Sequence, residues 1–204
     1  MDKVDYKKEL RTLYGGRVDQ LVAVHVPPMN FVMIDGHGDP NTSTEYADAI
    51  QTLFPLAYAI KFICKQNQIE DFGVMPLEGL WWAEDMREFT TADKSNWLWT
   101  AMIMQPPVVT TELFRHAVEQ VAAKRGPNGL GEVRLQSYDE GRAAQLLYEG
   151  PFSGEGPAIE RLHAFIADQG GRLQGTTKHH HEIYLSDPRR TQPSKLRTII
   201  RQPY

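Results

Sequence analysis

The residues best suited to chemistry lie near the C-terminus, in the segment KHHHEIY at residues 178–184. Alternate side chains of a β-strand share a face, so a strand here places His180, Glu182 and Tyr184 together. A carboxylate beside a phenol can stabilise a bound cation or orient a water molecule for attack. Glu182 and Tyr184 are therefore candidate catalytic residues, with His180 as a neighbouring ligand-binding residue. The alternative, a solvated glutamate on the surface, stays open.

The same segment contains three consecutive histidines, which raises the question of a metal site. In a strand, His179 and His181 lie on one face and His180 lies on the other, so only two of the three can reach one ion. The sequence has no second cluster of histidines or cysteines that would complete a four-ligand set. We therefore expect neither a metal nor a cofactor.

All four tryptophans of the chain lie in two neighbouring segments that read as strands. Alternation places Trp97 and Trp99 on one face of their strand, and Trp81 and Trp82 on opposite faces of theirs. Clustered indole rings can hold flat, polycyclic or cationic ligands by stacking and cation–π attraction. We take all four as candidate ligand-binding residues, with Trp82 and Trp99 foremost. The alternative, that the rings simply fill a core, stays open.

The elements that position these residues follow one order twice along the chain. Each half reads as a strand, a loop rich in glycine and proline, a helix and two further strands. The expected segments are strands at 31–35, 74–82 and 97–104 with a helix from about 42 to 66, and then strands at 142–148, 180–185 and 195–201 with a helix at 157–168.

This order predicts an α+β fold with duplicated strand-helix-strand-strand units related by a pseudo-two-fold axis. We interpret residues 1–204 as a single domain: repeat 1 at about 20–106, a connecting helix at about 107–130, and repeat 2 at about 131–204. The groove at the axis between two such units is the expected ligand site.

Composition excludes several classes of protein. The net charge of −4 leaves no basic footprint for nucleic acid, so we expect no nucleic-acid partner. No apolar run approaches the roughly 20 residues that cross a bilayer, and the charged N-terminus does not resemble a signal peptide. Cys64 is the single cysteine, which is typical of a reducing compartment. We expect a cytoplasmic protein with no membrane association.

Five segments carry a resemblance to a known family. They are FVMIDGHGDPN at 31–41, MPLEGLWW at 75–82, WTAMIMQP at 99–106, HHEIYLSDPRRT at 180–191 and KLRTIIRQP at 195–203, and they resemble stand-alone proteins of the GyrI-like small-molecule-binding family. The resemblance implies the duplicated fold found in the effector-binding domains of drug-responsive transcription activators. Those domains bind aromatic, often cationic drugs, and a buried glutamate meets the charge. By position in repeat 2, Glu182 corresponds to that glutamate.

The resemblance also implies an activity. Similar stand-alone members are linked to hydrolysis of cyclopropanoid DNA-alkylating natural products, which detoxifies them. On this hypothesis Glu182 activates a water molecule that opens the strained ring, and Tyr184 positions it. We expect burial among aromatic rings to raise the pKa of Glu182 toward the range of a base.

Two further aromatic residues complete the candidate ligand-binding set. Tyr148 ends the first strand of repeat 2, at a position where the family often has a histidine, and Phe152 lies in the loop that follows. This chain therefore differs from the family's usual pattern at the edge of the site where the substrate would lie.

Two other functions stay open beside the enzyme. The protein would then be a multidrug-binding protein that sequesters ligands without chemistry, or a ligand-sensing regulator that acts on a protein partner. The absence of a helix-turn-helix segment before the repeats argues against a transcription activator.

Overall fold

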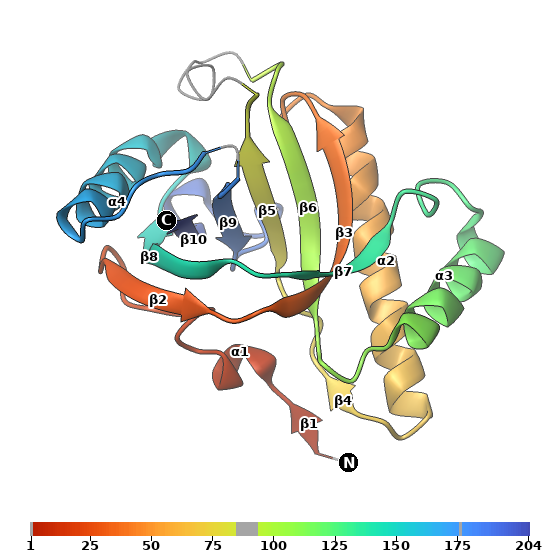
Figure 1. Ribbon diagram of the computed structural model, residues 1–204. Coiled ribbons are helices and arrows are strands. Elements are labelled where there is room, and N and C mark those ends of the chain that lie inside the picture. Colours follow the sequence, from red (N-terminus) through yellow and green to blue (C-terminus); the bar gives the residue numbers. More distant parts are fainter. Residues whose placement is uncertain (1, 85–93, 176) are drawn as a thin grey trace.

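The computed structural model describes residues 2–84, 94–175 and 177–204, which form an α+β fold (Figure 1). The predicted fold class is confirmed. The strands are β1 (Lys3–Val4), β2 (Val22–Val26), β3 (Met29–His37), β4 (Asp71–Phe72), β5 (Leu77–Trp82), β6 (Leu98–Gln105), β7 (Arg134–Tyr138), β8 (Gly141–Glu149), β9 (His180–Tyr184) and β10 (Arg197–Pro203). The helices are α1 (Tyr6–Glu9), α2 (Thr44–Gln66), α3 (Thr111–Arg125) and α4 (Gly156–Asp168).

The duplicated order is visible in these elements: β3, α2, β5 and β6 in the first half correspond to β8, α4, β9 and β10 in the second. Both halves contribute to one eight-stranded sheet in the order β2-β8-β10-β9-β5-β6-β3-β7 among the described residues. β5 of the first half pairs with β9 of the second, with Trp81 opposite His180 and Gly79 opposite Glu182. This pairing brings the tryptophan strand beside the strand that carries the candidate carboxylate.

The sheet curls back on itself because its two edge strands lead directly into inner strands. β2 runs on into β3, and β7 runs on into β8. β2 and β3 form one long antiparallel ladder with β8 and β7, since Val26 pairs with Gly141 and Met29 pairs with Tyr138. In Figure 1 this ladder crosses over β5, β6, β9 and β10. The sheet therefore has an enclosed face, beneath the crossing ladder, and a helix face, against which α2 and α4 pack.

α2 is the main core helix of the first half. Ser43 caps it by accepting a hydrogen bond from the Tyr46 backbone N–H, which satisfies one of the free donors of the first turn. Contrary to the expectation from the sequence, one helix among the described residues, α2, is long and apolar enough to cross a membrane. Its buried residues recur at helical spacing and pack on β3 and β6, which is the behaviour of a core helix; they are Ala49, Leu53, Leu56, Ala57, Ile60, Ile63 and Cys64.

α4 covers the sheet in the second half. Ala158, Leu162 and Ile166, spaced four residues apart, are buried against β8 and β10. The helix begins at Gly156, one residue before the predicted start, and ends at Asp168 as predicted. Its N-terminal end lies close to β9, because the ring of Phe152 contacts that of Tyr184 with 5.7 Å between their centroids.

Gly36 in β3 gives a direct test of the packing between α2 and the sheet. A methyl group added there would overlap the indole ring of Trp99, which is fully buried. We expect Gly36→Ala to lower the free energy of unfolding by about 1–3 kcal/mol, measured by urea denaturation, because the core has no room for the added carbon. Gly131→Ala is the matched control, since its added methyl group meets nothing within 4 Å.

A network of charged side chains fills part of the enclosed face. His181 lies between two carboxylates, with Nε2 2.9 Å from Glu78 Oε2 and Nδ1 2.8 Å from Glu140 Oε1. Arg201 donates to Glu140 Oε2 at 2.9 Å and to Gln145 Oε1 at 2.9 Å. The side chains of His181, Glu78, Glu140 and Arg201 are at most 1% exposed. Two positive and two negative groups therefore share one buried space.

The opposing charges set the ionisation of this network. Burial alone would raise the pKa of Glu140, but the charges of His181 and Arg201 outweigh it and bring the pKa down to about 2. Burial alone would lower the pKa of His181, but Glu140 and Glu78 outweigh it and raise the pKa to about 9. Both groups are therefore charged near neutral pH.

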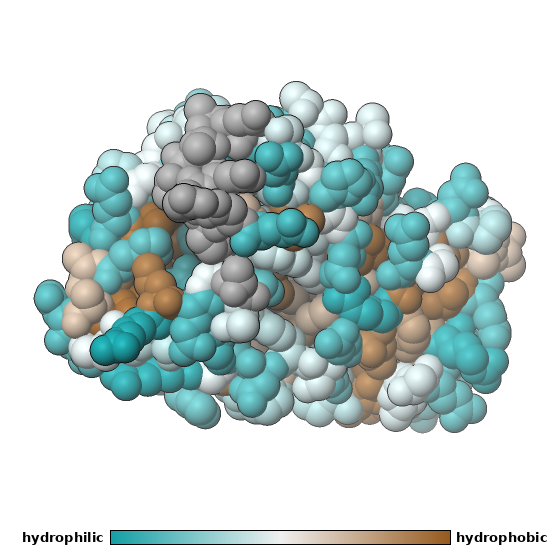
Figure 2. Space-filling model, turned by 45° about the horizontal axis from the view of Figure 1, so that its top comes forward, coloured by the Kyte–Doolittle hydropathy of each residue, from teal (hydrophilic) through white to brown (hydrophobic). Residues whose placement is uncertain are grey.

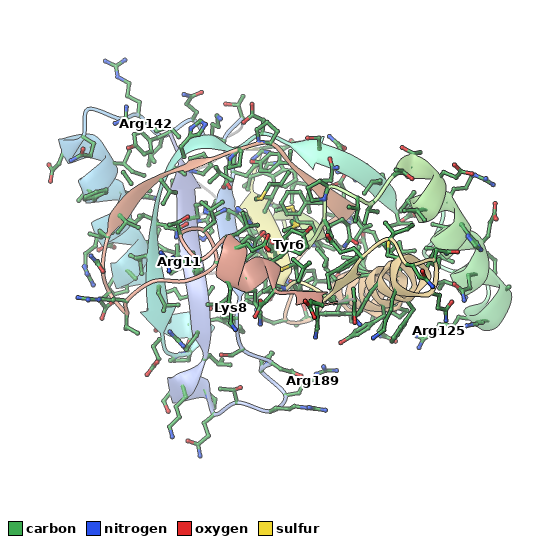
Figure 3. The ribbon with its side chains drawn as sticks, turned by 90° about the horizontal axis from the view of Figure 1, so that it is seen from below. Tyr6, Lys8, Arg11, Arg125, Arg142 and Arg189 are labelled. Atoms are coloured by element: carbon green, nitrogen blue, oxygen red, sulfur yellow. The ribbon has the colours of Figure 1, made fainter. Side chains whose placement is uncertain are left out.

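The N-terminal segment closes the network from below, as Figure 3 shows with α1 lying across the strands. The Tyr14 hydroxyl donates to Glu78 Oε1 at 2.7 Å, and Arg201 donates to the Leu13 carbonyl at 2.6 Å. Gln145 donates to the Thr12 carbonyl at 2.9 Å. Residues 12–14 thus satisfy buried polar groups that belong to the sheet.

Candidate acidic and aromatic site

The helix face carries a cluster of aromatic rings around Glu182. Trp81 Nε1 donates a hydrogen bond of 3.1 Å to the Tyr184 hydroxyl, which links β5 to β9. Tyr46 of α2 lies over both Trp81 and Trp99, with ring centroids 5.4 and 5.0 Å away. Trp97 lies 6.0 Å from Trp81 by the same measure. We call Tyr46, Trp81, Trp97, Glu182 and Tyr184 the acidic aromatic cluster.

Glu182 is charged within this cluster. His180 Nε2 lies 3.2 Å from Glu182 Oε1, and the side chain of Glu182 is only 15% exposed. Burial alone would raise its pKa, but hydrogen bonds and charge from His180, the Tyr184 phenol and the Lys94 ammonium lower it. The expected raised pKa of Glu182 is therefore wrong. The polar neighbours stabilise the carboxylate more than burial disfavours it.

A second carboxyl group, Glu155, lies in the same region and carries the raised pKa instead. It is 4% exposed at the N-terminal end of α4, and burial followed by the charge of Glu182 raises its pKa to about 9. Two nearby carboxylates cannot both ionise cheaply, so the pair holds one proton. The more deeply buried Glu155 keeps that proton, and Glu182 keeps the negative charge.

The predicted ligand-binding tryptophans divide between the two faces of the sheet. Trp81 and Trp97 belong to the acidic aromatic cluster. Trp82 points to the opposite face of β5 from Trp81, as strand alternation predicts, and its ring stacks 4.1 Å from that of His179. Trp99 is fully buried beneath Tyr46 and beside Gly36. The structure therefore places neither Trp82 nor Trp99, the two named foremost, at the cluster's open edge.

The remaining predicted residues lie around the start of α4. The Tyr148 hydroxyl donates to the Pro151 carbonyl at 3.1 Å, so this phenol holds the loop that leads into the helix. Phe152, in that loop, is 41% exposed beside Tyr184 and marks the cluster's solvent edge. His180 contacts Glu182, and the face shared by His180, Glu182 and Tyr184 is the one that alternation predicted.

Sequence reasoning missed Glu155 and Tyr46. Glu155 precedes a helix, where an acid ordinarily serves the helix dipole or caps it. Its side chain makes no capping hydrogen bond here, a distinction that the linear sequence does not carry. Tyr46 fits the apolar spacing of α2, and such spacing is typical of a core residue. The only signal for either residue is spatial proximity to β9.

No group of three or more metal-ligating side chains occurs within residues 2–84, 94–175 and 177–204. Two surface hollows lie away from the cluster. One, of about 540 Å³, lies between α2 and α3 and is lined by residues that include Phe54, Tyr58 and Phe62. Figure 2 shows hydrophobic surface, in brown, in its right half. The other, of about 740 Å³, is lined by Lys65, Gln68, Ile69 and Asp71. The buried carboxylate of the second hollow, Asp71, is already paired with Lys65 at 2.7 Å, and neither hollow places a carboxylate among aromatic rings.

The fold and the cluster define a small-molecule-binding α+β domain with a charged carboxylate among aromatic rings. The chain belongs to the GyrI-like small molecule binding domain family, whose profile matches residues 20–204. No match was found among curated proteins.

Solved structures place the chain beside bacterial relatives. A hydrolase from Listeria innocua is 38% identical, with a TM-score of 0.88 and 99% of each chain covered. An uncharacterized conserved protein from Listeria innocua is also 38% identical, with a TM-score of 0.88 and 98% of each chain covered. The C-terminal domain of EcmrR shares 14% identity with a TM-score of 0.53, over 90% of this chain and 96% of that one, which shows a common fold.

Proposed function

We propose that the protein binds flat aromatic or cationic small molecules at the acidic aromatic cluster and hydrolyses cyclopropanoid DNA-alkylating compounds, a detoxification carried out in the cytoplasm. One observation carries this proposal: Glu182 is a charged, mostly buried carboxylate among aromatic rings, hydrogen-bonded to a phenol. The hydrolase from Listeria innocua, similar over nearly the whole chain, supports a hydrolytic reaction.

The protein's own side chains support the preference for a cation. The ammonium of Lys94 lies 4.5 Å from the centre of the Trp97 ring and lowers the pKa of Glu182. A flat cationic ligand would make the same two interactions, by cation–π attraction and by ion pairing. Tyr46 and Trp81 supply further apolar surface for its rings.

In the proposed reaction Glu182 accepts a proton from a water molecule, and the Tyr184 hydroxyl orients the carboxylate and the water. The water oxygen bonds to a cyclopropane carbon, a ring C–C bond breaks, and its electron pair moves into a conjugated carbonyl group. A carboxylate with a lowered pKa is a weak base. Ring strain and correct orientation must therefore supply most of the rate.

The test is a turnover assay with the spirocyclopropyl dienone that water opens to para-hydroxyphenylethanol. We expect many molecules of the ring-opened alcohol per protein molecule, measured by chromatography and corrected for the uncatalysed reaction. A plateau at one molecule per protein would instead identify a protein that sequesters ligands without turnover. A rate equal to that in buffer would contradict the proposed activity.

A further inference from the structure

Glu155 is a buried acid that has no role in the reaction proposed above. Its side chain is 4% exposed, and its Oε1 atom has no hydrogen-bond partner within the part of the chain that the structure describes. The residue is the N-cap of α4, yet it makes no side-chain capping bond. Most buried polar atoms in folded proteins have a hydrogen-bond partner, so the unpaired Oε1 atom of Glu155 is free to bond to a ligand.

Charged and titratable groups reach Glu155 from several elements. Glu182 and Tyr184 face it from β9, Tyr148 from β8, and Lys94 from the segment before β6. Burial and the charge of Glu182 raise the pKa of Glu155 to about 9, although Thr198 and Lys94 oppose the rise. Glu155 therefore carries a proton at neutral pH, while Glu182 is charged.

We infer that Glu155 is the proton donor of the hydrolysis at this cluster, acting on the carbonyl oxygen of the substrate while Glu182 acts on the attacking water. The inference rests on the proposed function and adds a second residue, with its own role, to the reaction proposed there. In known enzymes, two carboxyl groups whose environments give them different pKa values act as the acid and the base of the reaction.

The step balances without any other reactant. The water oxygen bonds to the cyclopropane CH2 carbon, and the water gives one proton to Glu182. The C–C bond to the spiro carbon breaks, and its electron pair makes the dienone ring aromatic. The former carbonyl oxygen takes a proton from Glu155, which gives a neutral phenol. A proton then passes from Glu182 to Glu155 and restores the starting state.

The experiment compares the pH dependence of kcat for the wild-type protein and Glu155→Gln with the spirocyclopropyl dienone. Wild-type kcat should fall as the pH rises through about 9, because Glu155 then loses its proton. The variant should lose roughly 100- to 10,000-fold in kcat, the range for removal of a general acid, and should lose the alkaline fall. Probe affinity should change little. Glu160→Gln, an exposed change on the same helix, should leave kcat and its pH dependence unchanged.

The pH profile separates a proton donor from a merely structural residue. His181 also titrates near pH 9, but a fall caused by that network would persist in Glu155→Gln. Wild-type turnover with an unchanged rate or alkaline fall in Glu155→Gln would overturn the inference and leave the proposed function standing. If the variant does not fold, a wild-type kcat without an alkaline fall overturns it. If the wild-type protein does not turn over the probe, both proposals are wrong.

Discussion

Arg201→Met is expected to lower the free energy of unfolding by about 3–5 kcal/mol, the cost of removing one partner of a buried ion pair. The change leaves Glu140 with His181 as its charged partner among the described residues and leaves the carbonyl of Leu13 without its donor. The substituted side chain cannot replace those hydrogen bonds in a space closed to water. Urea denaturation followed by tryptophan fluorescence measures the effect.

Arg197→Met is the matched control, since it is the same substitution on the same strand. Arg197 is 47% exposed, and its Nε lies 4.0 Å from Glu149 Oε2. A surface pair of this kind contributes at most about 1 kcal/mol. Equal losses of unfolding free energy in the two variants would show that the buried network contributes no more to stability than a surface ion pair.

The network also predicts how stability varies with pH. The pKa of His181 is raised to about 9, so its contribution is complete below its unfolded value of 6.5 and is lost as the pH rises through 9. The pKa of Glu140 is lowered to about 2, so its contribution is complete above 4.5 and is lost as the pH falls toward 2. By linkage the network therefore makes its largest contribution to stability at about pH 4.5–6.5, and Arg201→Met should flatten the acid side of that contribution.

Glu182→Gln is expected to reduce kcat for the spirocyclopropyl dienone by roughly 100- to 10,000-fold, because the amide cannot accept the proton of the attacking water. Affinity for the neutral probe should change little. Affinity for a flat aromatic cation should fall, since the charge that meets it is gone. Initial-rate kinetics and isothermal titration calorimetry separate the two effects.

Glu149→Gln controls for the loss of one negative charge near the site, because that side chain is 44% exposed at the end of β8. It should match the wild-type protein in both measurements. A folded Glu182→Gln variant with full turnover would remove Glu182 from the reaction. Unchanged affinity for the cation would remove it from binding.

Much of the fold follows from local signals in the sequence. A capping hydroxyl at Thr42 or Ser43 and the apolar spacing after it predict α2, and strand alternation predicts that His180, Glu182 and Tyr184 share a face. These features depend on residues close together in the chain. β1 has no such signal, because its two residues form a strand only by pairing with β4 about 68 positions away, Lys3 with Asp71.

The site was harder to predict than the fold, because its chemistry depends on which buried groups meet. Glu182 was expected to be the one buried carboxylate, yet Glu78, Glu140 and Glu155 are buried more deeply. Alternation separates Trp81 from Trp82 but does not say which of the two faces carries the ligand. The pKa of Glu182 was predicted in the wrong direction, since burial was counted without the hydrogen bond from His180.

The position of β10 in the sheet has a consequence for synthesis on the ribosome. β10 lies between β8 and β9, and Arg201 within it joins Glu140 to the Leu13 carbonyl. Neither the sheet nor the buried network can close until residues 197–203 have left the exit tunnel. β3, β5 and β6 of the first repeat can pair with one another earlier, but the edge of β5 that pairs with β9 stays open until the second repeat is made, and such a nascent chain is exposed to aggregation. We expect its yield in cells to depend on chaperones that hold unfinished chains.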